Sequence, residues 1–186
     1  MEIPSEKVAL AQKLMITKCN IAGKFCICAT QMLESMCDNP LPTRAEMLDV
    51  ANAVFDGCDC TMLSGETANG ANPDVAVATM AAIAANAEVG CDGDMTYKNV
   101  WNNTPKPVTA LEAVASSAVK ACLDMGACCM AVFAQTMLPA ALLSKYKPPV
   151  PIVVVTTNHR VAAQCNVVSG LVPMYLPEMR TSDETM

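Results

Sequence analysis

Apolar positions in the first half of the chain follow two alternating periods. Over residues 5–18, apolar side chains recur every three or four positions with Lys and Gln between them, which predicts an amphipathic helix. Residues 25–29 and 60–63 are short apolar runs of the kind expected for buried strands. Residues 43–55 and 74–88 predict two further helices. Because short apolar strands alternate with longer helices, we expect an α/β fold whose strands are parallel and covered by helices.

Two of the predicted helices begin with capping signals. Thr43 and Glu46 form a capping box, in which the threonine accepts a hydrogen bond from the first turn and the glutamate reaches back to the backbone of the cap. Thr109 and Glu112 repeat this pattern at the start of a helix that is expected to end near Gly126. Each box indicates where a helix begins.

The second half of the chain repeats the alternation after an irregular stretch. Residues 91–107 contain Gly, Asp, Asn, Thr and Pro without a period, which indicates a linker between two domains. After a helix over 109–125, the pattern predicts strands and helices in turn, at 128–133, 139–146, 152–155, 159–166 and 171–176. The run Ile-Val-Val-Val at 152–155 is β-branched throughout and predicts a central strand. The polar tail from Pro177 is expected to fray.

Composition and charge exclude several classes of protein. The chain has 186 residues, of which 53% are hydrophobic, so a sizeable core is possible. A net charge of −6 argues against a nucleic-acid partner. No basic start leads into an apolar run, and no stretch reaches the roughly 18 apolar residues of a spanning helix. We therefore expect a cytoplasmic protein without a membrane partner.

The chain is unusually rich in cysteine, with eleven residues. Two Cys-x-Cys pairs, Cys26/Cys28 and Cys58/Cys60, lack the spacing of a zinc site, and His159 is the single histidine. An odd number of cysteines without a secretory signal argues against a disulfide framework. We expect most of them to be small buried hydrophobic residues, with no bound metal.

Several segments resemble one enzyme family when they are taken together. They read Cys-Ala-Thr-Gln-Met-Leu-Glu-Ser-Met at 28–36, Pro-Thr-Arg-Ala-Glu at 42–46, Asp-Val-Ala-Asn-Ala-Val at 49–54 and Met-Leu-Ser-Gly-Glu-Thr-Ala at 62–68. In order and spacing they are similar to the seventh and eighth barrel-strand regions of the pyruvate kinases. Ser-Lys-Tyr-Lys-Pro at 144–148 is similar to the C-terminal domain of that family, so the resemblance covers nearly the whole chain.

The resemblance implies an incomplete (β/α)8 barrel followed by a partial α/β C-terminal domain. Residues 1–90 would be the last strand-helix units of the barrel, residues 91–107 the linker and residues 108–186 the C-terminal domain. A whole barrel needs about 250 residues, so the first part of this chain is too short to be one. The implied activity is phosphoryl transfer from phosphoenolpyruvate to ADP, which gives pyruvate and ATP in glycolysis.

Three residues are candidates for the catalytic site, namely Thr30, Ser64 and Glu66. Each follows a predicted strand, and the catalytic residues of barrel enzymes gather at the carboxyl ends of the strands. A threonine hydroxyl can bind a substrate carboxylate or pass a proton to an enolate through water. The resemblance places Thr30 at the substrate, with Ser64 and Glu66 lining the same pocket and supporting a proton relay. Taken alone, Thr30 has the pattern of a helix cap, and Ser64 to Glu66 that of a strand-to-helix turn with a solvated carboxylate.

The resemblance also implies cofactors whose ligands lie elsewhere in the family. Its ligands for Mg2+ and K+, its catalytic lysine and its phosphate-binding arginine belong to upstream segments, and none of those motifs occurs in these 186 residues. Neutralisation of the transferring phosphate by Mg2+ is essential to the chemistry, so we predict that this chain alone is inactive. The implied partners are phosphoenolpyruvate, ADP, further copies of the chain in a homo-oligomer, and a complementary N-terminal half.

Three further positions are interpreted from the resemblance. Residues 135–140 occupy the loop that holds a sugar-phosphate effector in regulated members. Here this loop has a suitable hydroxyl only at Thr136, and Pro139 donates no N–H, which argues against an effector phosphate. Arg44 begins a helix that the family places near a subunit contact, although a solvated first-turn residue has the same pattern. His159 is expected to be a polar residue at a helix start.

Three hypotheses about function remain open at this point. The first is a piece of a pyruvate kinase, as an incomplete gene product or a fragment of a longer enzyme. The second is a non-catalytic interaction or regulatory protein that binds a full-length kinase. The third is a misfolding remnant, because a partial barrel would expose an unpaired strand edge near Phe25.

Overall fold

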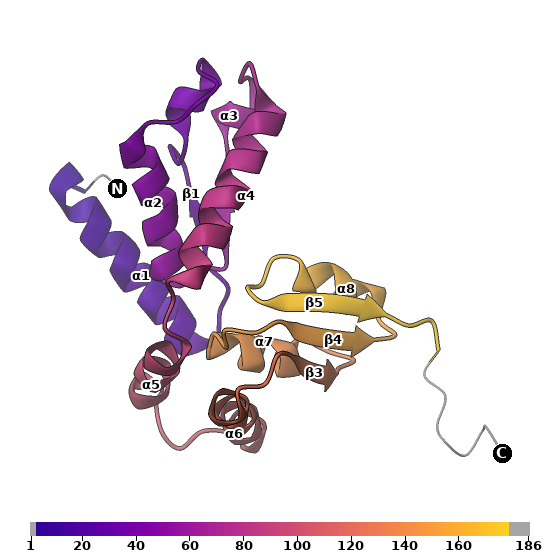
Figure 1. Ribbon diagram of the computed structural model, residues 1–186. Coiled ribbons are helices and arrows are strands. Elements are labelled where there is room, and N and C mark those ends of the chain that lie inside the picture. The colour runs from indigo at the N-terminus through magenta and orange to yellow at the C-terminus, as the bar shows by residue number, and fades with distance from the viewer. Residues whose placement is uncertain (1–2, 179–186) are drawn as a thin grey trace. The chain divides into compact units, whose positions relative to one another are not determined.

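A computed structural model of the chain describes residues 3–178 (Figure 1). The chain forms two compact units, Met1–Asp92 and Gly93–Met186, designated unit 1 and unit 2. Both contain helices and parallel strands, so the predicted α/β class is confirmed. Most of the predicted polar tail, from residue 179 onward, lies outside the described residues. Within the described residues, no single helix is both long and apolar enough to cross a membrane.

Unit 1 contains two short parallel strands and several helices (Figure 1). Its elements are, in chain order, η1 Ser5–Lys7, α1 Val8–Ala22, β1 Ile27–Ala29, η2 Glu34–Cys37, α2 Arg44–Phe55, β2 Cys60–Met62, α3 Gly65–Ala68 and α4 Pro73–Val89. Strand β1 pairs with β2, with Ala29 in register with Met62. The predicted alternation of strands and long helices is confirmed, and a short helical turn, η2 or α3, follows each strand.

The core of unit 1 joins the long helices to the loop that follows β1. Its buried members are Ile16, Met32, Leu33, Met36, Val50, Ala53, Cys58, Ala76 and Met80. Three of them, Met32, Leu33 and Met36, belong to the loop after β1 rather than to a long helix. That loop is therefore anchored by apolar side chains.

Burial in unit 1 differs from the prediction for α1 and for the strands. In α1 only Ile16 and Asn20 are buried, whereas Leu14 and Met15 are 55% and 59% exposed. Ile27 in β1 is also exposed, although its strand was predicted to be buried. The period of apolar positions predicts a helix but not which side of it is buried, because that side depends on the neighbouring elements. In a sheet of two strands, much of each strand surface stays uncovered by other described residues.

Unit 2 is built on a parallel sheet with the strand order β3-β4-β5. Its elements are, in chain order, α5 Gly93–Asn103, α6 Ala110–Met125, β3 Met130–Phe133, α7 Met137–Lys145, β4 Ile152–Thr156, α8 His159–Cys165 and β5 Leu171–Tyr175. Strand β4 lies between the other two, and four of its five residues are buried. The prediction of a central β-branched strand is confirmed.

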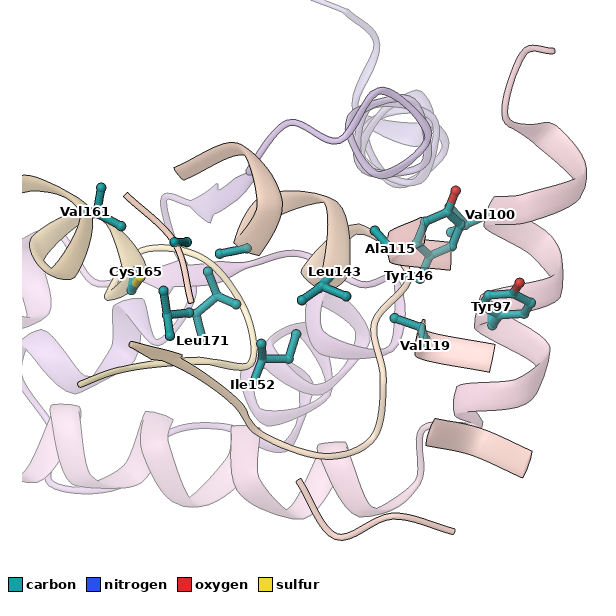
Figure 2. Packing of buried hydrophobic residues seen from close by; sticks show 13 residues of the cluster. Tyr97, Val100, Ala115, Val119, Leu143, Tyr146, Ile152, Val161, Cys165 and Leu171 are labelled. Atoms are coloured by element: carbon teal, nitrogen blue, oxygen red, sulfur yellow. The ribbon is translucent and has the colours of Figure 1, made fainter. Parts of the chain in front are cut away.

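The core of unit 2 packs helices against one face of the sheet (Figure 2). Ile152 and Leu171 contribute from the sheet, and Tyr146 at the end of α7 is completely buried. The ring of Tyr146 lies 5.4 Å from that of Tyr97 and 6.4 Å from that of Trp101, measured between centroids. This aromatic group joins α5 to the rest of unit 2.

Helix α5 occupies most of the stretch 91–107 that was predicted to be irregular. Tyr97 and Val100 on this helix are buried, and Trp101 packs against the same core. The three residues follow the i, i+3, i+4 spacing of an amphipathic helix, a signal that the surrounding Gly, Asp, Asn and Pro obscured. The expectation of an irregular segment was wrong here, while the domain boundaries at 90 and 108 stay a prediction.

The start of α6 shows only half of the predicted capping box. Thr109 Oγ1 accepts a hydrogen bond from the backbone N–H of Glu112 at 3.2 Å. The Glu112 carboxylate turns away from the cap to form an ion pair with Lys145, and it accepts a hydrogen bond from the Tyr146 hydroxyl at 3.1 Å. The side chain of Lys145 is only 3% exposed, so this ion pair joins α6 to α7 inside the protein.

The second face of the unit 2 sheet is apolar and lies largely open among the described residues. It consists of alternate residues in register across the strands, namely Ala131, Phe133, Val153, Val155, Val172 and Met174. Phe133 is 72% exposed and Val172 and Met174 are about half exposed, whereas Val155 on the central strand is buried. This set is called the open face.

Candidate active site

The carboxyl ends of β1 and β2 bring the predicted site residues to one edge of the unit 1 sheet. The strands are parallel and Ala29 is in register with Met62, so the loops after them leave the sheet at the same edge. Thr30 is the first residue after β1, and Ser64 lies two positions after β2 and directly precedes α3. Strand-end position was the basis of the prediction, and the catalytic roles themselves stay predictions.

Thr30 is held in an unfavourable backbone conformation. Thr30 and Gln31 have φ values of 79° and 56°, in the left-handed region that β-branched residues rarely adopt. Each such residue costs roughly 1–3 kcal/mol unless its surroundings compensate. No helix begins at Gln31, because the next helical turn, η2, starts at Glu34. The interpretation of Thr30 as a helix cap is therefore wrong, and its side chain is exposed instead.

Glu66 is fully buried, with 0% of its surface exposed. Its Oε1 accepts a hydrogen bond from the backbone N–H of Leu33 at 3.0 Å, and its Oε2 accepts one from the N–H of Ser64 at 2.6 Å. Burial alone would raise the pKa of this carboxyl, but the backbone N–H groups of Glu66, Ser64 and Leu33 outweigh burial and lower it. The interpretation as a solvated turn residue is wrong, because Glu66 is an ionised bridge between the two strand-end loops.

A second carboxylate, Glu46 in the first turn of α2, holds the loop after β1 from its other end. It accepts hydrogen bonds from the backbone N–H and the hydroxyl of Ser35, at 2.7 and 2.6 Å. It also accepts bonds from the N–H and hydroxyl of Thr43, at 2.7 and 2.8 Å, so the predicted capping box is confirmed. Partial burial opposes ionisation, yet these donors lower the pKa of Glu46 to about 2.

The bond from Glu46 to Ser35 was missed at the level of sequence. A capping box predicts contacts within one turn, whereas Ser35 lies 11 positions before Glu46. The only available signal was that both residues fall within the segments that resemble the family.

The acidic side chains of the described residues do not form a site for Mg2+. Among the described residues, no group of three or more His, Cys, Asp or Glu side chains is placed to hold a metal ion. At the candidate site, Glu46 and Glu66 use both carboxylate oxygens to accept bonds from N–H and O–H groups. Neither carboxylate presents a free oxygen pair to an ion.

The cysteines are less buried than predicted. None of the eleven forms a disulfide bond, and only Cys58, Cys122 and Cys165 are buried. The expectation that most of them fill the core is therefore wrong. Cys28 lies within β1, where burial and then the nearby carboxylates of Asp56 and Asp49 raise the pKa of its thiol.

The loop over residues 135–140 in unit 2 binds polar groups of its own domain. Gln135 Oε1 accepts a hydrogen bond from the Thr157 hydroxyl at 2.9 Å, and the Gln135 carbonyl accepts one from the Asn158 side chain at 3.3 Å. Thr136 precedes α7 without a side-chain capping bond. These contacts are compatible with the expectation that this loop holds no effector phosphate, which stays a prediction.

The two remaining singled-out residues lie at helix starts. Arg44 is the exposed first residue of α2. His159 is the exposed first residue of α8, and its ring stacks on that of Tyr175 with 3.8 Å between the centroids.

Two family models match most of the chain. Residues 1–77 match the model described as "Pyruvate kinase, barrel domain", and residues 112–186 match the model described as "Pyruvate kinase, alpha/beta domain". The crystal structure of a pyruvate kinase from Cryptosporidium parvum has a TM-score of 0.95 and 47% sequence identity over 99% of the chain. The fold and these matches together define an α/β protein whose two parts match the barrel domain and the alpha/beta domain of one enzyme family.

Curated relatives extend the same finding. A pyruvate kinase of Kluyveromyces lactis is 48% identical over 100% of the chain, and one of Leishmania mexicana is 49% identical over 92%. The cytosolic isozyme of Nicotiana tabacum is 54% identical over 82% of the chain. The chain belongs to the pyruvate kinase family. It spans about a third of the length of these relatives, at 37%, 34% and 30%, and 37% of the solved Cryptosporidium chain.

Proposed function

We propose that this chain carries part of the active site of a pyruvate kinase, which transfers a phosphoryl group from phosphoenolpyruvate to ADP and yields pyruvate and ATP. Residues 1–90 would be the last strand-helix units of an incomplete barrel, and residues 108–186 a partial C-terminal domain. The observation that carries the proposal is the Glu66 carboxylate, which fastens the two strand-end loops that bear Thr30 and Ser64.

Thr30 is assigned to the substrate in this proposal. Its side chain is exposed just beyond the carboxyl end of β1, where barrel enzymes bind their substrates. The hydroxyl can donate a hydrogen bond to the carboxylate of phosphoenolpyruvate. It can also pass a proton, through water, to the enolate that remains when the phosphoryl group leaves. Ser64, at the end of the neighbouring strand, would extend the path of that proton.

The 186-residue chain by itself is expected to be inactive. Phosphoryl transfer depends on metal ions and cationic side chains that neutralise the phosphate, and the described residues hold no cluster of three or more His, Cys, Asp or Glu side chains for such an ion. A complementary N-terminal half would bind those ions. We place the assembled enzyme in the cytoplasm, in keeping with the tobacco relative that is named a cytosolic isozyme.

A coupled assay with phosphoenolpyruvate, ADP, Mg2+ and K+ tests the proposal. We expect no turnover from the chain alone, and turnover when a purified N-terminal half of a pyruvate kinase is added. Thr30→Ala should lower kcat of the mixture by roughly 100-fold, whereas Thr30→Ser keeps the hydroxyl and should retain most of the activity. The matched control is Thr17→Ala, on an exposed position of α1, which should leave kcat unchanged.

Three other outcomes would contradict the proposal in distinct ways. Turnover by the chain alone would show that the upstream segments are dispensable. A mixture without turnover, from a chain that unfolds cooperatively in urea, would support the non-catalytic interaction protein. The same result without a cooperative transition would indicate a misfolding remnant.

A further inference from the structure

The strained loop that carries Thr30 is held by contacts made a few residues further along the chain. Thr30 and Gln31 adopt left-handed φ values that neither residue favours. Their side chains are exposed, so neither is held in this conformation by burial. The conformation is therefore imposed by the segments on either side, the paired strand β1 before Thr30 and the residues that follow Gln31.

Two kinds of contact fix those following residues. Met32, Leu33 and Met36 are buried in the core of unit 1, with 4%, 0% and 0% of their surfaces exposed. The backbone of the loop is bound by two carboxylates, since Glu66 accepts the N–H of Leu33 and Glu46 accepts the N–H of Ser35. The Glu66 bond is the polar contact nearer to Thr30 in sequence.

Glu66 also binds the second strand-end loop through the N–H of Ser64. A single side chain thus sets the separation between the loop of Thr30 and the loop of Ser64. An amide at this position would present an NH2 group to one of the two N–H donors, so only a carboxylate can accept from both.

The same geometry makes Glu66 a poor partner for a reacting proton. Its surface is 0% exposed, and each oxygen is already an acceptor for a backbone N–H. An ionised carboxylate is an acceptor only, and these bonds stabilise its charged form. A proton delivered to Glu66 would have to displace a backbone hydrogen bond in a buried site.

We propose that Glu66 is a positioning residue, which holds Thr30 in its strained conformation at a fixed distance from Ser64, and that it does not itself relay a proton. The link to catalysis rests on the proposed function. The link to the loop conformation rests on the contacts alone, and it can be measured without any activity.

Amide hydrogen exchange of the full chain, followed by mass spectrometry of its peptides, tests the structural part. In Glu66→Gln, peptides that cover residues 32–36 and 62–66 should exchange roughly 10- to 100-fold faster, because one hydrogen bond is lost and the other is no longer charge-assisted. The matched control is Glu34→Gln, which removes the same charge from an exposed position in the same loop and should leave both peptides unchanged. Glu66→Asp provides a second variant, which keeps the charge but is one methylene too short to reach both loops.

Activity in the complemented mixture tests the catalytic part. Glu66→Gln should lower kcat by roughly 10- to 100-fold with an unchanged KM for ADP, because a small displacement of Thr30 is enough to slow the reaction. If Glu66 acts through Thr30, the double variant Thr30→Ala/Glu66→Gln should be no slower than Thr30→Ala alone. The pH profile of kcat should keep its shape in both single variants of Glu66.

The outcomes separate this inference from the proposed function. Unchanged exchange in Glu66→Gln and Glu66→Asp would overturn the positioning role, whatever the activity. Loss of one limb of the pH profile, or a double variant much slower than Thr30→Ala, would identify Glu66 as a proton relay and would also overturn it. An inactive mixture with the unaltered chain would contradict the proposed function, while faster exchange in Glu66→Gln would still support the role of Glu66 in holding the loops.

Discussion

Glu46 makes the stability of unit 1 depend on pH. Its pKa falls from 4.5 to about 2 on folding, so its contribution is present above pH 4.5 and is lost as the pH falls through about 2. After allowance for solvent screening, we expect this contribution to be about 1–2 kcal/mol. Glu66 acts in the same direction, because its pKa is also lowered.

Urea titration followed by far-ultraviolet circular dichroism checks this expectation. Glu46→Gln keeps the size of the side chain but not its charge, and should unfold at lower urea than the unaltered chain at neutral pH. The difference should shrink as the pH approaches 2. The matched control, Glu88→Gln on an exposed position of α4, should show no such convergence. A gap between Glu46→Gln and the unaltered chain that stays constant with pH would refute the role of the carboxylate.

Gly70 allows the chain to pass close to the backbone of Glu66. A Cβ atom at this position would lie 2.2 Å from the Glu66 carbonyl oxygen, which is far inside van der Waals contact. We therefore expect Gly70→Ala to lower the free energy of unfolding of unit 1 by about 1–3 kcal/mol. Faster exchange of the Leu33 and Ser64 amides should accompany the loss, because Glu66 must move.

Gly126→Ala separates steric overlap from backbone conformation. Gly126 has a φ of 61°, but an added Cβ would meet nothing within 4 Å. Its cost should come from the left-handed backbone alone, at about 1 kcal/mol. If Gly70→Ala is no more harmful than Gly126→Ala in urea unfolding, the overlap with Glu66 is relieved by a small shift and the explanation fails.

Single residues show how far the candidate site could be predicted. Thr30 and Ser64 were located because strand ends are visible as the ends of apolar runs. The buried position of Glu66 could not be predicted. Its carboxylate accepts a hydrogen bond from Leu33, which lies 33 positions away and donates through its backbone rather than its side chain. A backbone donor has the same chemistry in every residue except proline, so its partner leaves no mark in the sequence.

At the scale of elements, the ion pair between Glu112 and Lys145 carries the contact between α6 and α7. Lys145 is buried, and removal of its partner would leave a charge without compensation. We expect Glu112→Ala to lower the free energy of unfolding of unit 2 by roughly 3–5 kcal/mol. In the unaltered chain, burial and then the Glu112 carboxylate raise the pKa of Tyr146, so its hydroxyl stays protonated in mild alkali.

Fluorescence of Trp101, the only tryptophan, measures this loss because the residue packs against Tyr146. Thr109→Ala removes only the cap of the same helix and should cost about 1 kcal/mol. The double variant Glu112→Leu/Lys145→Met, which replaces the pair by apolar residues, should recover much of the stability lost in Glu112→Ala. Similar costs for Thr109→Ala and Glu112→Ala would mean that the carboxylate acts merely as part of the cap.

Elements were predicted better than their environments. Strand β4 was recognised as central because four β-branched residues in a row, at 152–155, suit a strand that is paired on both edges. Helix α1 was predicted as a helix, but the side of it that is buried was predicted wrongly. Ile16 and Asn20 are buried because the neighbouring loop and helices pack against them. Helix α5 was missed because its apolar stripe, Tyr97, Val100 and Trp101, is short and surrounded by polar residues.

At the scale of the whole molecule, each unit has its own core. The buried cluster of unit 2 runs from Tyr97 to Leu171, and that of unit 1 from Ile16 to Met80. We expect a fragment of residues 93–178 to unfold cooperatively in urea, with a Trp101 fluorescence midpoint close to that of the full chain. A fragment without a cooperative transition would show that unit 2 needs residues before Gly93.

The family was recognised from the order of its motifs rather than from any single residue. The motifs at 28–36 and 62–68 include the loops after β1 and β2, where a substitution would alter the candidate site. Their residues are therefore distinctive of the family. The core around Val119 and Leu143 contains ordinary apolar residues that many folds use. The α/β class therefore followed from periodicity, whereas the domain architecture required the resemblance.

The open face of the unit 2 sheet bears on how the chain behaves in concentrated solution. Salts such as ammonium sulfate strengthen apolar association without weakening the fold, so they should bring copies of the chain together through Phe133 and its neighbours at concentrations where each copy is still native. The highest protein concentration that stays in solution is then limited by association through the open face, and not by the free energy of unfolding. A variant that precipitates at a lower salt concentration than the unaltered chain, but unfolds at the same urea concentration, associates more readily through this surface while its fold is intact.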